Sequence, residues 1–166
     1  MKNVQTIHLP PEGRILALDL GKRRVGLALS DPLRLTAQGL DTLYRTRIRD
    51  DLDYLDRLVA ERGVTGILIG NPLHMSGHEG RQSAWAREFA ERLSGHTGIP
   101  VALWDERLTS REAGRVLRES GIGIEKRARA VDRLSAVILL ESYLDYLQIA
   151  ATGFVPAMDD EVPVSE

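Results

Sequence analysis

Two short apolar runs, separated by only four residues, constrain the fold of this chain more than any other feature. Residues 14–19 (RILALD) form an almost continuous apolar run that ends in a carboxylate, and residues 24–30 (RVGLALS) form the second run. Such runs are typical of strands that are covered on both faces. The intervening segment, 20–23, contains Gly21, which adopts positive φ without steric cost. The two runs therefore predict a β-hairpin, which Asp31–Pro32 ends.

After the hairpin, the apolar pattern alternates between strand and helix periods. Asp50 is the expected N-cap of the first helix, Gly63 its expected stop, and Thr109 with Glu112 an expected capping box. The pattern predicts strands at 38–44, 66–70 and 100–104, and helices at 50–62, 83–93, 109–120 and 131–147. The order is βββαβαβαα, in which the first three strands are antiparallel and later strands join through right-handed crossovers. We therefore expect an α/β fold: one five-stranded mixed sheet with helices on both faces.

The length and composition indicate one globular domain. A chain of 166 residues fits a single domain of roughly 100–200 residues. We expect an N-terminal extension at 1–13, loosely attached, a domain at 14–150 and an acidic, disordered tail at 151–166. The absence of cysteine excludes disulfides, thiolate zinc sites and a cysteine nucleophile. With no secretory signal and no apolar run near the ~18 residues of a membrane span, we expect a soluble cytoplasmic protein.

The charge distribution leaves the question of a nucleic-acid partner open. The net charge of −2 argues against such a partner, but the last 16 residues carry four acids and no base. The rest of the chain has 22 basic and 20 acidic residues, and 19 of the basic residues are Arg. Arg contacts phosphate in a bidentate manner that Lys does not match. Genomic codon bias explains the Arg content equally well.

Acidic residues stand at the ends of predicted strands and at the start of the last helix. Asp19 ends a buried strand, where a charge is costly unless it is paired or binds metal. Asp105–Glu106 ends another strand, and Asp132 opens the last helix. Carboxylates without a His or Cys partner suit Mg²⁺ or Mn²⁺ rather than zinc. Each acid also has a structural explanation. Asp19 could begin a turn, Asp105 or Glu106 could form a surface ion pair with Arg107, and Asp132 could be an N-cap.

Four motifs in this order resemble those of the YqgF/RuvX family. They are Ala17–Gly21 with Arg24–Ser30 and Asp31–Pro32; Gly70–Leu73 with Gly77 and Gly80; Asp105–Thr109; and Val131–Ala136. Each motif alone is weakly specific, but together they cover about residues 14–147. Ser110 and Ser135 depart from the residues usual in the family, and both are small. The terminal segments fall outside the pattern.

The resemblance implies an RNase H-like fold and a metal-dependent endonuclease related in fold to the RuvC Holliday-junction resolvase. Carried over position by position, it implies that Asp19, Glu106 and Asp132 are the catalytic residues and the ligands of two Mg²⁺ or Mn²⁺ ions. Two such ions, roughly 3.5–4 Å apart, stabilise the attacking water and the leaving oxygen of a phosphodiester.

Basic residues near these acids are candidates for binding nucleic acid. The candidates are Lys22, Arg23 and Arg24 in the hairpin, Arg107 and Arg111 on a predicted helix, and Lys126, Arg127 and Arg129 in an expected basic loop. A solvated helix face with i,i+4 ion pairs is the alternative for the helix. His74 and His78 are candidates for proton transfer, or else exposed loop residues. We expect Trp85, Phe89 and Trp104 to belong to the core.

The sequence therefore predicts a hydrolase, an endonuclease that acts on structured nucleic acid. The resemblance implies two substrates, a four-way DNA junction in recombination and repair, or the 5′ end of pre-16S rRNA in ribosome biogenesis. A junction has twofold symmetry, which would favour a homodimer. The alternative is a non-catalytic nucleic-acid-binding module of the same fold. A kinase of the actin or hexokinase type needs a second lobe, for which the chain is too short.

Overall fold

The computed structural model describes residues 9–72, 76–77, 80–106 and 124–152, with only the backbone described for 124–129. The predicted helix at 109–120 and its capping box lie outside the described residues. The described elements are β1 (Arg14–Leu20), β2 (Arg24–Ser30), β3 (Ala37–Tyr44), α1 (Ile48–Arg62), β4 (Val64–Asn71), α2 (Arg81–Thr97), β5 (Val101–Asp105) and α4 (Ile124–Thr152). Every strand that the sequence predicts is present, with bounds that differ by at most two residues.

The strands form one mixed sheet in the order β3-β2-β1-β4-β5. β1 pairs antiparallel with β2, and β2 pairs antiparallel with β3. β1 pairs parallel with β4, and β4 pairs parallel with β5. The predicted five-stranded mixed sheet is therefore confirmed, and β1 is its central strand.

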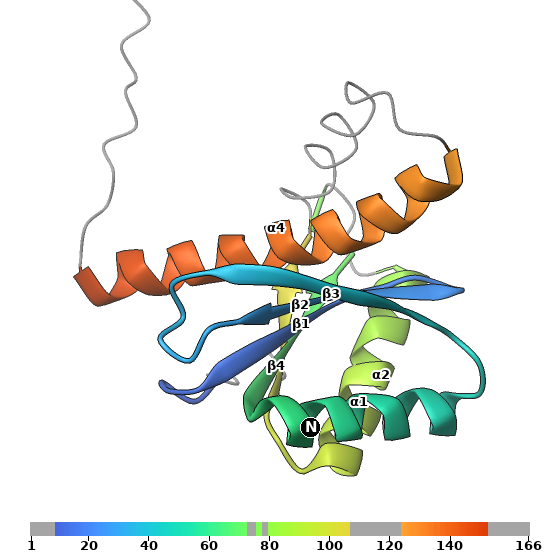
Figure 1. Cartoon of the computed structure of the whole chain (residues 1–166), viewed down its shortest axis with the longest axis horizontal. Helices are drawn as coiled ribbons and strands as arrows, with labels where there is room; N and C mark the ends of the chain where they lie inside the picture. Colours follow the sequence, from blue (N-terminus) through green and yellow to red (C-terminus); the bar gives the residue numbers. More distant parts are fainter. Residues whose placement is uncertain (1–8, 73–75, 78–79, 107–123, 153–166) are drawn as a thin grey trace, which may run out of the picture.

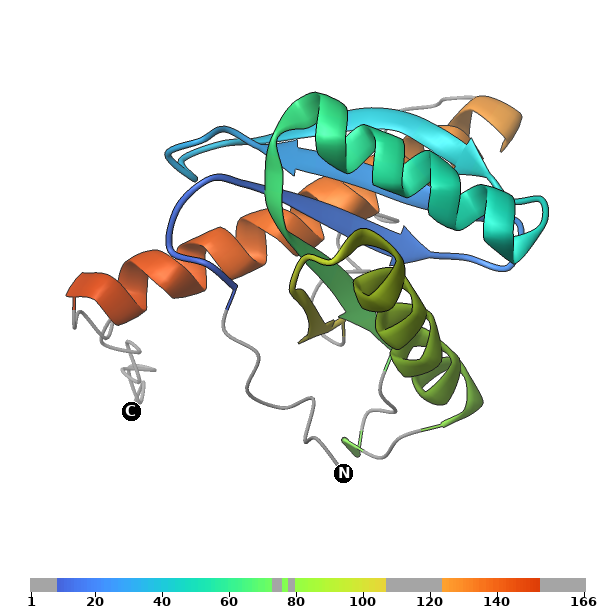
Figure 2. The ribbon, with the colours of Figure 1, turned by 90° about the horizontal axis from the view of Figure 1, so that it is seen from below.

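Both faces of the sheet are covered, as the continuous apolar runs require. Side chains alternate between the faces along a strand. Leu16 and Leu18 of β1 belong to the cluster under α1 and α2, while Ile15 and Ala17 belong to the cluster under α4. Figure 1 shows α4 on one side of the sheet and α1 and α2 on the other, and Figure 2 shows the same layers from below.

The last helix begins earlier than the sequence predicts. α4 starts at Ile124 and ends at Thr152, so the expected loop containing Lys126, Arg127 and Arg129 is helical. The segment 124–130 (IEKRARA) consists mostly of strong helix formers, which outweigh the glycines that precede it. Asp132 therefore lies inside a helix and is not an N-cap.

The first helix also begins earlier than predicted, although its end is confirmed. Arg47 is the N-cap of α1, and Asp50 and Asp51 lie in the first turn, where their charges favour the helix dipole. Asp51 is buried and accepts a hydrogen bond from the Thr46 amide at 3.1 Å. Gly63 ends the helix in the left-handed conformation, with φ of 64°.

Residues 9–13, the described part of the segment before the sheet, pack against it, while the rest of the expected extension lies outside the described residues. Leu9 is buried in the cluster under α4 and lies against Gly66. Arg34, in the loop after β2, donates hydrogen bonds to the carbonyls of Gly13 at 2.9 Å and Glu12 at 3.1 Å. These contacts hold residues 9–13 next to the start of β1.

The aromatic residues only partly follow the sequence-based expectation. Phe89 is buried as predicted, but Trp85 and Trp104 are half-buried. Trp104 packs edge-on against Tyr143 of α4, with ring centroids 5.2 Å apart. The buried residues of α4 are Ala136, Leu139, Leu140, Tyr143 and Leu144, whereas Leu134, Val137 and Ile138 are half-buried.

One stretch of α4 is long and apolar enough to cross a membrane, contrary to the sequence-based expectation. It spans Ala130–Ala151, with a mean hydropathy of 1.3. In the structure this helix packs on β1, β2 and β3, and Ala136, Leu139 and Leu140 are buried there. A helix that covers a sheet in a protein core can have the same composition, although only 28% of this apolar stretch is buried in the structure.

Leu68→Ala should destabilise the protein by about 2–5 kcal/mol, because truncation of a buried Leu leaves a cavity. Leu68 is 0% exposed and lies on β4 under α4. The matched control is Leu33→Ala at 77% exposure, which should change stability by less than about 0.5 kcal/mol. Urea unfolding measures both variants, and equal losses would contradict the packing described.

Candidate active site

Asp19 lies one residue before the end of the central strand, on the face that α4 covers. Ile15 and Ala17 occupy the same face of β1 and are completely buried. Burial raises the pKa of Asp19 above its ordinary value, while a hydrogen bond with the Glu106 side chain lowers it. The strand thus carries a carboxyl group into a weakly hydrated position, as the sequence predicts.

Glu106 follows β5 and places its carboxyl beside that of Asp19. Its amide donates a hydrogen bond to the Asn71 carbonyl at 3.1 Å, which holds the backbone next to β4. Burial is the largest of the causes that raise the pKa of Glu106 to about 8, and the hydrogen bond with Asp19 and the charges of Asp19 and Asp105 act in the same direction. The two carboxyls therefore share one proton, which the pair keeps well above the pH at which a free carboxyl group loses it.

Asp132 approaches the pair from α4. Arg24 Nε lies 3.1 Å from Asp132 Oδ2, yet this oxygen is buried and has no hydrogen-bond partner among the described residues. The short distance and the missing hydrogen bond are compatible, because Arg24 can balance the negative charge of Asp132 without directing an N–H group at Oδ2. Burial and the charge of Asp19 raise the pKa of Asp132, and Arg24 lowers it.

Two glycines make room for these acids. Gly26 of β2 is the register partner of Asp19, and a Cβ at Gly26 would collide with the backbone carbonyl of Asp132. Gly70 of β4 follows Ile69, the register partner of Leu18, and a Cβ there would collide with the Glu106 carboxylate. Glycine on the strands at both sides of Asp19 lets α4 and Glu106 come close to it.

The three acids fit a hard cation by their donor chemistry. Asp19 and Glu106 share a proton whose place a divalent cation would take, and no described residue donates a hydrogen bond to Asp132 Oδ2. Carboxylate oxygens are the ligands that Mg²⁺ and Mn²⁺ prefer. In this arrangement, no three acidic or histidine side chains of the described part of the chain lie close enough to hold one ion. Asp19 and Glu106 form the close pair, and Asp132 stands further away.

The structure describes only some of the other candidates. Lys22 and Arg23 are exposed in the turn between β1 and β2, and Arg24 pairs with Asp132. Arg107, Arg111, His74 and His78 lie outside the described residues, as do the side chains of Lys126, Arg127 and Arg129. His96 is not one of these candidates, and its Nε2 lies 2.8 Å from Asp53 Oδ1.

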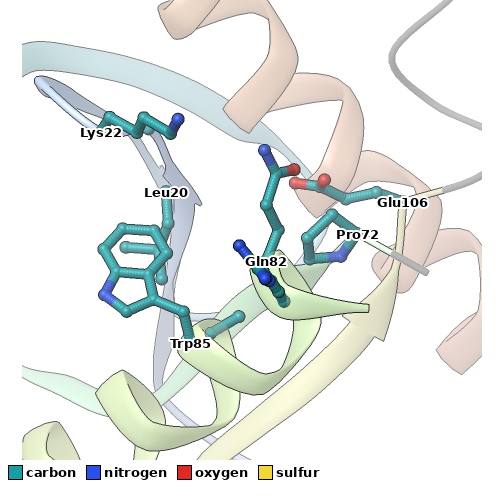
Figure 3. A pocket seen from close by; sticks show the side chains of 9 residues that line it. Leu20, Lys22, Pro72, Gln82, Trp85 and Glu106 are labelled. Atoms are coloured by element: carbon teal, nitrogen blue, oxygen red, sulfur yellow. The ribbon is translucent and has the colours of Figure 1, made fainter. Parts of the chain in front are cut away.

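Beside the acids is a cavity that the sequence does not predict. It has a volume of about 540 Å³ and lies between the β1–β2 turn and the start of α2. Figure 3 shows Trp85 and Lys22 on one side and Gln82, Pro72 and Glu106 on the other. Trp85 is one turn before Phe89 on α2, a helical spacing that indicates a core position for both residues. The place of Trp85 at the start of α2 leaves its ring partly exposed.

Comparison with known proteins identifies the family. A family model described as "RuvX: Holliday junction resolvase" matches residues 13–146. The chain belongs to the RuvX family. Two curated relatives, from Koribacter versatilis (strain Ellin345) and Syntrophus aciditrophicus (strain SB), bear the name "Putative pre-16S rRNA nuclease". The first is 50% identical to this chain, over 87% of this chain and 92% of the relative. The second is 48% identical, over 80% of this chain and 88% of the relative.

The fold of this chain is similar to that of a solved structure. RuvC of T. thermophilus, in complex with a Holliday junction substrate, aligns with a TM-score of 0.53. The alignment covers 84% of this chain and 96% of that chain, at 12% identity. The likeness confirms the predicted RNase H-like fold, and the family is one of nucleases.

Without metal, the protein should become less stable as the pH rises. Folding raises the pKa of Glu106 from 4.5 to about 8, so the folded chain keeps a proton that the unfolded chain releases. The stabilisation is therefore complete below pH 4.5 and is lost as the pH rises through about 8. Asp19 and Asp132 shift in the same direction.

Urea unfolding in the presence of EDTA, at a series of pH values, measures this dependence. Glu106→Gln should reduce the slope and should be more stable than the wild type at the high end. Glu88→Gln, at an exposed site on α2, is the matched control and should keep the wild-type slope. Identical slopes for all three proteins would contradict the shared proton.

Gly26→Ala should destabilise the protein by about 1–3 kcal/mol, because the added methyl group overpacks the contact with α4. Gly95→Ala is the matched control, since Gly95 lies in α2 with open space around its Cα. That change should be neutral or stabilising by up to about 1 kcal/mol. Urea unfolding tests both, and a neutral Gly26→Ala would show that α4 does not depend on this close approach.

Proposed function

We propose that this RuvX family member is a divalent-metal-dependent endonuclease that hydrolyses phosphodiester bonds of structured nucleic acid. The observation that carries the proposal is the carboxyl pair of Asp19 and Glu106 with Asp132 nearby. Asp19 of β1 and Glu106 after β5 are in contact, Asp132 of α4 lies near enough for its pKa to respond to the charge of Asp19, and burial raises the pKa of all three acids. A structural role alone gives no reason to gather three acids in a weakly hydrated site.

Asp19, Glu106 and Asp132 would hold Mg²⁺ or Mn²⁺. Such ions would supply activation of water and stabilisation of the leaving oxygen. Asp19 and Glu106 would act as ligands together, because their carboxyls already contact each other. Arg24 would hold the Asp132 carboxylate in place through its 3.1 Å ion pair. Lys22 and Arg23, exposed in the adjacent turn, would contact the phosphates on either side of the cleaved bond.

Two substrates are consistent with the family. The names of the relatives point to pre-16S rRNA, and the family description points to a Holliday junction. We favour the rRNA precursor, because those relatives are up to 50% identical to this chain, whereas the junction-bound RuvC is 12% identical. A cytoplasmic location and a homodimer remain part of the proposal, and the dimer would matter most for a symmetric junction.

A non-catalytic binding module is the alternative function. Such a module has no need for acids that share a proton. Divalent-dependent cleavage of a pre-16S rRNA fragment and of a four-way DNA junction, side by side, separates the two functions. The absence of cleavage of both, with binding retained, would favour the module.

Asp19→Asn, Glu106→Gln and Asp132→Asn should each lower the cleavage rate by at least about 100-fold. Loss of even an outer partner of a metal site costs 10–100-fold. Each amide keeps the shape of the acid but not its charge. Mg²⁺ should raise the melting temperature of the wild type and should raise that of these variants less. Asp105→Asn is the neighbouring control and should be milder. If Asp105→Asn is the most impaired variant, the metal ligand is Asp105 and not Glu106.

A further inference from the structure

The cavity next to Glu106 has the size of a ligand pocket. Its volume of about 540 Å³ lies within the ~300–1,000 Å³ that is usual for small-molecule sites. Its walls include Leu20, Lys22, Arg81, Gln82, Trp85 and Glu106. The lining therefore combines an aromatic ring and apolar groups with two cations, an amide and the Glu106 carboxyl.

Trp85 is held with one face of its ring already occupied. The guanidinium of Arg45 lies over the ring, 4.6 Å from its centroid. Arg45 in turn donates to the Gly21 carbonyl at 3.2 Å and pairs with Asp51 at 3.3 Å. Arg45 covers one face of the ring, and Trp85 is also part of the cavity wall, so a ligand in the cavity meets the part of the ring that Arg45 leaves uncovered. A fixed aromatic ring in a cavity wall is suited to contact with a planar group.

The cations of the cavity lie at its rim. Lys22 and Arg81 are both exposed, on the β1–β2 turn and at the first residue of α2 respectively. Figure 3 shows Lys22 above the Trp85 ring, and Gln82 extending towards Glu106. A ligand that stacks on Trp85 and carries phosphates would have its planar part inside and its charge at the rim. A nucleotide has this distribution of groups.

We infer that the cavity binds one unstacked nucleotide of a single-stranded segment next to the bond that is cleaved. This inference rests on the proposed function and specifies its substrate. Glu106 belongs both to the carboxyl pair and to the cavity wall, so a nucleotide bound here is a direct neighbour of the bond at the acids. Bases in a fully paired junction are stacked in their helices and would first have to be unpaired and unstacked, which costs free energy. The cavity therefore favours a substrate with unpaired nucleotides at the cleavage site.

The fluorescence of Trp85 reports stacking directly. The chain has two Trp residues, and Trp104→Phe leaves Trp85 as the only one. In EDTA, which prevents cleavage, a single-stranded RNA oligonucleotide should quench the emission saturably. The same sequence in a fully paired duplex, and inorganic polyphosphate, should quench little. A DNA strand of that sequence, compared with the RNA, shows whether the sugar contributes. The absence of quenching by either single strand, or equal quenching by polyphosphate, would overturn the inference.

Substitutions in the otherwise native chain give a second measurement, which does not depend on the Trp104→Phe variant. Trp85→Leu should weaken binding of the single strand by roughly 5- to 150-fold, the usual effect of losing one base stack. Trp85→Phe should retain most of the affinity. Melting temperatures show that each variant is folded. If Trp85→Leu binds as tightly as the wild type, the inference is wrong.

The rim cations are tested through the salt dependence of binding. Lys22→Gln and Arg81→Gln should each lower the slope of log K against log salt by about 0.7, the value for one phosphate contact on a single strand. Arg92→Gln is the matched control on α2, in an exposed pair with Glu88, and should leave the slope unchanged. Equal slopes for all variants would remove the cations from the site.

Cleavage separates failure of this inference from failure of the proposed function. A substrate with unpaired nucleotides at the cleavage site should be cut faster than a fully paired one. Metal-dependent cleavage that is equal on both, with no quenching, would overturn the inference and leave the nuclease function intact. Quenching by single strands without any cleavage would support the nucleotide pocket and overturn the nuclease function.

Discussion

The hydrogen-bonded carboxyl pair of Asp19 and Glu106 is the interaction on which the rest of the site depends. Two carboxyls this close cannot both be ionised at low cost unless a proton or a cation lies between them. Burial at the end of the central strand increases that cost, which is why the pKa of Glu106 rises to about 8. The surroundings accommodate the pair: Gly26 and Gly70 leave it room, and Arg24 balances the third acid. The site is therefore arranged to exchange a proton for a cation.

The sheet order explains how residues distant in the sequence meet. β1, β4 and β5 are parallel neighbours, so their carboxyl ends, which carry Asp19, Asn71 and Asp105, lie at one edge of the sheet. Because β2 is antiparallel to β1, the hairpin turn with Lys22 and Arg23 lies at that edge as well. The same connectivity that forms the core thus brings cations next to acids. A phosphodiester backbone needs both, since cations hold its phosphates and acids hold the metal.

The strands and the acids were predictable because their signals are local. A buried run that ends in Asp19, and Glu106 after another such run, follow from periodicity and from the motifs that resemble the family. The choice of Glu106 over Asp105 came from the resemblance, and the contact with Asp19 agrees with it. The early start of α4 was missed because helix propensity outweighed the neighbouring glycines. The roles of Gly26, Gly70 and Arg45 were missed because each depends on contacts between elements far apart in the sequence.

Arg45 links the strand that carries Asp19 with the cavity that Trp85 lines. Its side chain joins the Gly21 carbonyl in the hairpin turn, Asp51 of α1 and the Trp85 ring of α2. The turn follows Asp19 directly, so the position of the ring is tied to the strand that carries the acid. A base stacked on Trp85 would therefore lie at a fixed distance from the carboxyl pair. Such fixed placement is what selects one bond among many chemically identical phosphodiesters, because the phosphate groups themselves carry no sequence information.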